Sequence, residues 1–144
     1  MNICELTPDL EILGGGDLTE IGEKGVNLSG GQKQRISIAR ALYYDADIYL
    51  IDDCLSALDS YVGKSIFKNV LKKYLHEKGK TVIFVTNAID YTDECDRILV
   101  MQNGRIVEDG TPEELKAEAP VYAELKLELK KTQSEEEERK QKEK

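Results

Sequence analysis

Two short stretches of this 144-residue chain hold residue types that could bind a phosphorylated ligand. The first reads LSGGQ at residues 28–32, and a basic, helix-forming segment follows it at once. A Gly-Gly step lets the backbone approach a phosphate closely, because no Cβ atom intervenes. Ser29 adds a hydroxyl group, and the helix after it offers unpaired N–H groups and the positive end of its dipole. The stretch is a predicted anion site suited to a γ-phosphate, although a plain helix N-cap at Ser29 or Gly30 has the same local pattern.

The second stretch is an apolar run that ends in two carboxylates, Asp52 and Asp53. Residues 48–51 are continuously apolar, which predicts a strand buried on both faces of a parallel sheet. Asp52 then falls at the carboxyl end of that strand, where open α/β sheets place their ligands. A carboxylate there suits Mg²⁺, which keeps much of its hydration shell. An acidic strand end without a metal is the alternative interpretation.

In this order and spacing, the stretches resemble three linked motifs of the ATP-binding cassette family. LSGGQ resembles the signature motif, residues 48–53 resemble the Walker B strand, and the SALD sequence at residues 56–59 resembles the D-loop. The resemblance runs from about residue 5 to about residue 118. It implies an α/β fold of the P-loop NTPase type, with a parallel sheet and flanking helices, and a small C-terminal hairpin. It also implies a membrane transporter driven by ATP and Mg²⁺, with this segment on the cytoplasmic side.

The resemblance also implies a role for each motif residue. In the family, the signature motif closes over ATP held by the opposing domain of a head-to-tail dimer. The motif residues would therefore act in trans on a second nucleotide-binding domain; they are Ser29, Gly30, Gly31 and Gln32. Asp52 would bind Mg²⁺, and Asp59 would help to join the sites of the two domains. Membrane-spanning domains of a parent transporter are the other implied partners.

Two positions depart from the family pattern, and both belong to the site that this domain would build with its own ATP. Asp53 stands where the family has the glutamate that activates the attacking water, and a displacement of about 1 Å can cost roughly a hundredfold in rate. Asn87 stands where the family has a histidine that contacts the γ-phosphate, and asparagine cannot carry a proton at neutral pH. This asymmetry and the lead-in, residues 10–13 and 15–25, resemble the first nucleotide-binding domain of the C subfamily, the multidrug-resistance-protein-like transporters.

No phosphate-binding loop of the form GxxxxGK[ST] is found in the sequence. Two partial matches are rejected, because residues 63–65 lie in a predicted helix and residues 79–81 lead into a predicted strand. We therefore expect an incomplete domain that lacks its N-terminal, Walker A half and does not hydrolyse ATP when isolated. Three alternatives stay open: a trans-acting regulatory module, a non-functional fragment, and a soluble cassette protein of translation or repair.

Composition and patterning set the remaining expectations. A net charge of −8 argues against general nucleic-acid binding, and no apolar stretch is long enough to cross a bilayer. Residues 1–129 form the predicted nucleotide-binding part, and residues 130–144 form a charged tail or linker, expected to be disordered or a solvated helix. Strands are predicted at residues 47–52, 80–86, 97–102 and 104–108, with a tight turn at Asn103-Gly104. Helices are predicted at residues 31–43, 60–77, 88–94, 112–118 and 121–131.

Overall fold

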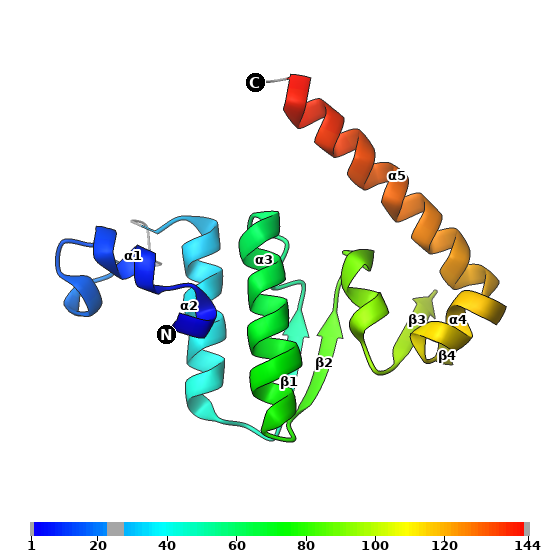
Figure 1. Ribbon diagram of the computed structural model, residues 1–144, viewed down its shortest axis with the longest axis horizontal. Helices are drawn as coiled ribbons and strands as arrows, with labels where there is room; N and C mark the ends of the chain where they lie inside the picture. Colours follow the sequence, from blue (N-terminus) through cyan, green and yellow to red (C-terminus); the bar gives the residue numbers. More distant parts are fainter. Residues whose placement is uncertain (1, 23–27, 143–144) are drawn as a thin grey trace. The chain divides into compact units, whose positions relative to one another are not determined.

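The structure, a computed structural model, describes residues 2–22 and 28–142. The chain divides into two compact units, residues 1–86 and residues 87–144 (Figure 1). The first unit contains, in chain order, η1 (Asn2–Cys4), α1 (Thr7–Ile12), η2 (Gly16–Leu18), α2 (Gly30–Tyr44), β1 (Ile48–Asp52), α3 (Ser60–Ile66), η4 (Phe67–Leu75) and β2 (Thr81–Val85). The second unit contains η5 (Ile89–Glu94), β3 (Ile98–Gln102), β4 (Arg105–Gly110), α4 (Pro112–Glu118) and α5 (Pro120–Lys142).

The first unit is built on a parallel pair of strands, as the two apolar runs predict. Strand β1 pairs with β2 in a register that runs from Ile48 opposite Thr81 to Asp52 opposite Val85. The connection between the strands is the helix formed by α3 and η4, whose core side chains are fully buried. Phe84 of β2 packs on Phe67 of this helix, with the ring centroids 5.9 Å apart. The α/β fold class and the parallel sheet are therefore confirmed.

The prediction that these strands are buried on both faces is wrong within the described residues. Alternate side chains of both strands face solvent, since Leu50 is 76% exposed and its partner Ile83 is 52% exposed. The other face is covered by helices, and Tyr49 there is 5% exposed. A continuous apolar run indicates that a strand has apolar side chains on both faces. One layer of helices can bury only one of these faces.

The long helix between the strands begins where it is predicted and changes its winding partway. Residues Ser60–Ile66 are α-helical, and residues Phe67–Leu75 form a π-helix with i→i+5 hydrogen bonds. The wider turn buries Leu75 completely, whereas Tyr74, the predicted last residue of the apolar face, is only half-buried. Ile66 and Val70 complete the buried face, and both are fully enclosed.

The second unit confirms the local predictions for the C-terminal part of the chain. Strands β3 and β4 pair antiparallel around Asn103 and Gly104, whose φ angles of 52° and 74° are those of a type I′ turn. Helix α4 begins with a capping box, in which the Glu114 N–H donates to Thr111 Oγ1 and the Thr111 N–H donates to Glu114 Oε2. The hairpin and this helix start are specified by the residues that form them.

A carboxylate from β4 joins the hairpin to the last helix. The oxygens of Glu108 accept hydrogen bonds from the N–H groups of Val121 and Tyr122, at 2.9 Å and 2.7 Å, in the first turn of α5. The Tyr122 ring is buried in a small core with Val100 and Leu115. Helix α5 continues through the charged tail to Lys142. The boundary between a cassette part and a tail at residue 130 stays a prediction.

Asp93 should make the second unit sensitive to acid. Its Oδ1 lies 2.7 Å from the Lys126 ammonium and 3.2 Å from that of Lys116, and the hydrogen bond from Lys126 is the main cause that lowers the pKa of Asp93. A lowered pKa stabilises the fold above the unfolded value of about 3.9, and that stabilisation is lost as the pH falls through the folded value. We expect Asp93→Asn to lower the Tm by about 2 °C at pH 7 and to narrow the difference in Tm between pH 7 and pH 3.

Circular dichroism melts at the two pH values measure this effect. Asp90→Asn is the matched control, because Asp90 lies on the same helix η5 and is exposed, with no ion pair among the residues described. Equal Tm changes in the two variants would show that the lysine contacts of Asp93 do not stabilise the unit.

Candidate functional site

The LSGGQ stretch forms the N-terminus of α2, a helix of 15 residues. Ser29 is the N-cap: its Oγ accepts from the Gln32 N–H at 3.2 Å, and Gln32 Oε1 accepts from the Ser29 N–H at 2.9 Å. Within the described residues, the N–H groups of Gly30 and Gly31 have no hydrogen-bond partner. The helix cap and the anion site are therefore compatible, because the cap uses Ser29 and Gln32 and leaves two donors at the positive end of the helix.

Gly31 lies against the segment that resembles the D-loop. A Cβ atom at Gly31 would come within 3.3 Å of the Ala57 carbonyl oxygen and within 3.5 Å of Leu58 Cδ2. A Cβ atom at Gly30 would have no neighbour within 4 Å. A side chain at the second glycine would thus be tightly confined by the Ala57 backbone, whereas the first glycine is open on its side-chain face.

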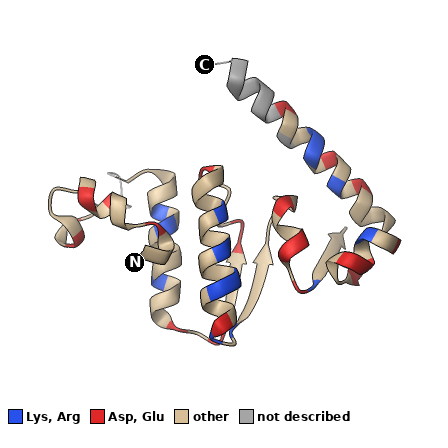
Figure 2. Ribbon diagram, viewed as in Figure 1, with Lys and Arg blue, Asp and Glu red and all other residues tan. Residues whose placement is uncertain are grey.

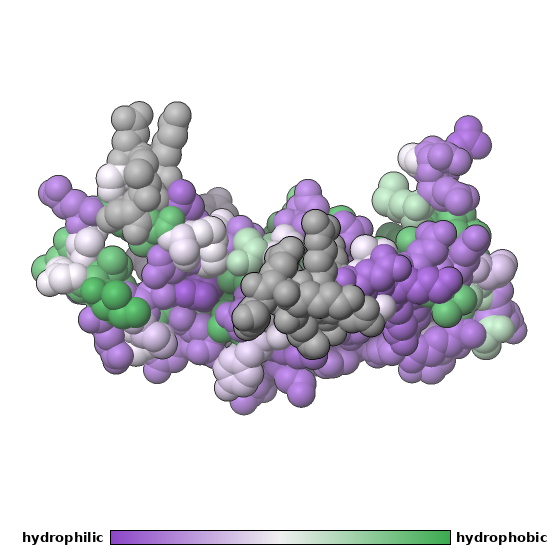
Figure 3. Space-filling view, turned by 90° about the horizontal axis from the view of Figure 1, so that it is seen from above, coloured by the Kyte–Doolittle hydropathy of each residue, from purple (hydrophilic) through white to green (hydrophobic). Residues whose placement is uncertain are grey.

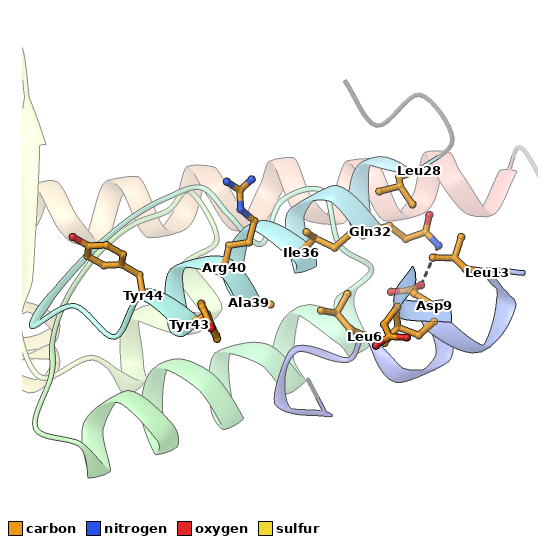
Figure 4. A pocket seen from close by; sticks show the side chains of 12 residues that line it. Leu6, Asp9, Leu13, Leu28, Gln32, Ile36, Ala39, Arg40, Tyr43 and Tyr44 are labelled. Carbon is orange, nitrogen blue, oxygen red and sulfur yellow. Dashed lines mark hydrogen bonds between the residues drawn. The ribbon is translucent and has the colours of Figure 1, made fainter. Parts of the chain in front are cut away.

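The start of α2 is also held by Asp9, a residue that belongs to no predicted motif. Asp9 of α1 is buried, and its carboxylate accepts from Arg35 Nε and Nη2 at 3.0 Å and 2.6–2.7 Å and from Gln32 Nε2 at 3.1 Å. Figure 2 shows acidic residues on the lead-in and basic residues along α2, and Figure 4 shows Asp9 and Gln32 side by side. No local pattern marks Asp9, since its partners lie 23 and 26 residues further along the chain.

The lead-in and α2 also enclose an open hollow of about 430 Å³. Its lining is mainly aliphatic and aromatic, and Asp9 and Gln32 stand among the lining residues (Figure 4). Exposed apolar side chains gather beside it on the lead-in, where Ile12 is 79% and Leu18 is 86% exposed (Figure 3). The predicted lead-in, residues 10–13 and 15–25, is described only as far as residue 22, and residues 23–25 lie outside the described residues.

Asp52 ends β1 on the exposed face of the sheet. Within the described part of the chain, its carboxylate has no hydrogen bond or ion pair, and no cluster of three or more metal-binding side chains is found. One accessible carboxylate fits Mg²⁺ that is held mainly by water and by substrate phosphates, and it does not fit a metal site made by this chain alone.

Asp53 has a left-handed backbone, with φ at 44°. Its N–H donates to the Val85 carbonyl at 2.9 Å, and its own carbonyl accepts from the Ser56 hydroxyl at 2.9 Å. Aspartate tolerates this conformation better than most residues do. Next to it, burial and the Asp53 charge raise the pKa of the Cys54 thiol to about 11, so this buried cysteine stays protonated and unreactive at neutral pH.

The remaining predicted site residues, Asp59 and Asn87, belong to different units of the chain. Asp59 is the N-cap of α3, where its Oδ1 accepts from the N–H groups of Tyr61 and Val62 at 3.1 Å and 3.0 Å. Asn87 is exposed and belongs to the second unit, just before η5. The rejected matches to a phosphate loop lie inside α3, at residues 63–65, and at the start of β2, at residues 79–81. No helix in the described ranges is long and apolar enough to span a membrane.

Sequence comparison relates the chain to a large group of transporters. A family model described as "ABC transporter" matches residues 6–56. The chain is 61% identical to "ABC transporter C family member 8" of Dictyostelium discoideum over 74% of its own length and 7% of that protein. It is 54% identical to the human "ATP-binding cassette sub-family C member 2" over 95% of its own length. The chain spans only 9% of that human protein.

A solved structure agrees with these relatives. The chain is similar to the "Structure of a bacterial Atm1-family ABC exporter with ATP bound", with a TM-score of 0.80 and 31% sequence identity. The match covers 88% of this chain and 22% of the exporter chain. Sequence and fold therefore point to the same family.

Proposed function

The chain belongs to the ATP-binding cassette transporter family, and we propose that it is the signature-bearing part of the ATP-binding domain of a membrane transporter. Domains of this family bind ATP, generally together with Mg²⁺. The observation that carries the proposal is the exposed N-terminus of α2, where the N–H groups of Gly30 and Gly31 have no partner within the described residues. The family matches give no support to the soluble or regulatory alternatives.

We propose that this end of α2 acts on ATP held by a second nucleotide-binding domain. The N–H groups of Gly30 and Gly31 donate to γ-phosphate oxygens, and the Ser29 hydroxyl lies beside them. Asp52, at the carboxyl end of β1, would hold the Mg²⁺ of this domain's own nucleotide, and that ion would offset phosphate charge when bound. Asp53 would be a weakened catalytic carboxylate, Asn87 would replace the phosphate-sensing histidine, and Asp59 would contact the opposing domain.

The coding sequence that flanks residues 1–144 is the first test. We expect it to encode membrane spans and a GxxxxGK[ST] loop on the order of a hundred residues before Leu28. We call that longer product the parent polypeptide, and we expect it to hydrolyse ATP with Mg²⁺ on the cytoplasmic side of a membrane. Purified residues 1–144 should show no turnover. A start and a stop codon that flank these residues directly would replace the proposal with a trans-acting or non-functional fragment.

In the parent polypeptide, Asp53→Glu should raise the rate of ATP hydrolysis at the domain's own site by about tenfold. This gain is smaller than the roughly hundredfold loss of rate that a 1 Å misplacement can cause. The extra methylene restores the reach of the carboxylate. The gain is limited because Asn87 remains and because glutamate is less suited to the left-handed backbone of residue 53. Single-turnover hydrolysis, with the second domain inactivated in its own phosphate-binding loop, measures the effect. Asp47→Glu is the control, since Asp47 is an exposed residue that precedes β1, and an equal rate in both variants would contradict the assignment of Asp53.

A further inference from the structure

The structure assigns a positioning role to Asp9: we propose that its carboxylate holds Gln32 and the start of α2 in the orientation that closes on the opposing domain's ATP. The inference rests on the proposed function, because it concerns the same signature residues. Asp9 is 9% exposed and lies on α1, outside every motif that the sequence identified.

A continuous set of hydrogen bonds connects Asp9 to Ser29, the N-cap residue of α2. Asp9 Oδ1 accepts from Gln32 Nε2 at 3.1 Å, and the other end of the same amide group, Oε1, accepts from the Ser29 N–H at 2.9 Å. The Ser29 hydroxyl in turn accepts from the Gln32 N–H. Both ends of the Gln32 side chain are thus occupied, so a shift of α1 would move the residues that face the nucleotide (Figure 4).

Arg35 fixes the carboxylate that orients Gln32. Its Nε and Nη2 donate to Asp9 at 3.0 Å and 2.6–2.7 Å, and both side chains are 13% exposed. Charge-assisted, forked contacts of this kind restrict the angle of the carboxylate as well as its distance. A Cβ atom at Gly31 would lie 3.3 Å from the Ala57 carbonyl oxygen and 3.8 Å from Arg35 Nη1. The glycine step therefore lies close to the same arginine that holds Asp9.

A structural role and a positioning role for Asp9 predict different kinetics. An ion pair that serves only the fold can be replaced by an apolar pair of similar volume without loss. The replacement Asp9→Leu with Arg35→Met removes the charges together but also removes the acceptor for Gln32. If Asp9 positions the signature motif, turnover must fall even when the fold is kept.

We would measure kcat, KM for ATP and Tm of the purified parent polypeptide for this double variant, for Asp9→Glu and for Glu11→Gln. Glu11 is the matched control, because it is an exposed carboxylate on the same helix with no side-chain hydrogen bond or ion pair among the described residues. We expect kcat to fall about tenfold in the double variant and about threefold in Asp9→Glu, which moves the acceptor by one methylene. KM should stay within about twofold, since the opposing domain binds its nucleotide before the two domains close.

Each result has a separate meaning. An unchanged kcat with an unchanged Tm in the double variant would overturn the positioning role. If the double variant does not fold, Asp9→Glu decides, because it keeps the charge for Arg35, and wild-type turnover in that variant would overturn the role equally. If the unmodified parent polypeptide hydrolyses no ATP, the proposed function itself fails.

Discussion

Gly31→Asp should lower ATP hydrolysis by the parent polypeptide by about a hundredfold or more, the usual cost of losing a fixed backbone donor to a reacting oxyanion. Two physical effects act together. A Cβ atom at residue 31 would come within 3.3 Å of the Ala57 carbonyl, so α2 or the D-loop segment must move. The carboxylate would also occupy the positive end of the helix and repel the γ-phosphate that we place there.

Gly14→Asp adds the same side chain and charge at a position where a Cβ atom has no neighbour within 4 Å. This control should hydrolyse ATP at the rate of the unmodified polypeptide, which separates the effect of position from that of net charge. Circular dichroism melts should show both variants folded. A folded Gly31→Asp variant with more than half of the original turnover would show that the N-terminus of α2 does not act on the nucleotide.

Ile66→Ala should lower the free energy of unfolding of the chain by about 3 to 4 kcal/mol, as expected for a large aliphatic side chain removed from a closed core. Ile66 is 0% exposed and lies where α3 passes into η4. Val70 and Leu75 of η4 are equally buried, and the helix that α3 and η4 form connects two paired strands. The cavity would therefore remain largely open, and its volume adds to the lost hydrophobic transfer free energy.

Ile83→Ala removes the same atoms from a side chain that is 52% exposed on the open face of β2. We expect this control to cost less than about 1 kcal/mol, because most of the side chain already contacts water. Urea unfolding followed by circular dichroism measures both variants. An equal decrease in the free energy of unfolding in the two variants would mean that the open face of the sheet is as tightly packed as the face covered by helices.

Local sequence patterns were enough to predict the elements from α2 onward and the order of the motifs, whereas η1, α1 and η2 were not predicted. Ser29 and Gln32 specify the start of α2, because a hydroxyl and an amide three residues apart cap each other within one turn. Asn103 and Gly104 specify the hairpin, because their φ angles must be positive there. These signals are local, so they act before any tertiary contact exists. The parallel strands were predicted from two apolar runs, and the α/β class was implied by the family resemblance.

Only the tertiary structure shows which side chains of these elements contact one another. Asp9 finds Gln32 and Arg35 across more than 20 residues of sequence, and Glu108 finds the first turn of α5 in the same way. One face of the β1–β2 pair is open although both faces are apolar. The path of the chain decides which residues distant in sequence meet and which side chains become buried. A local pattern of residues contains no information about that path.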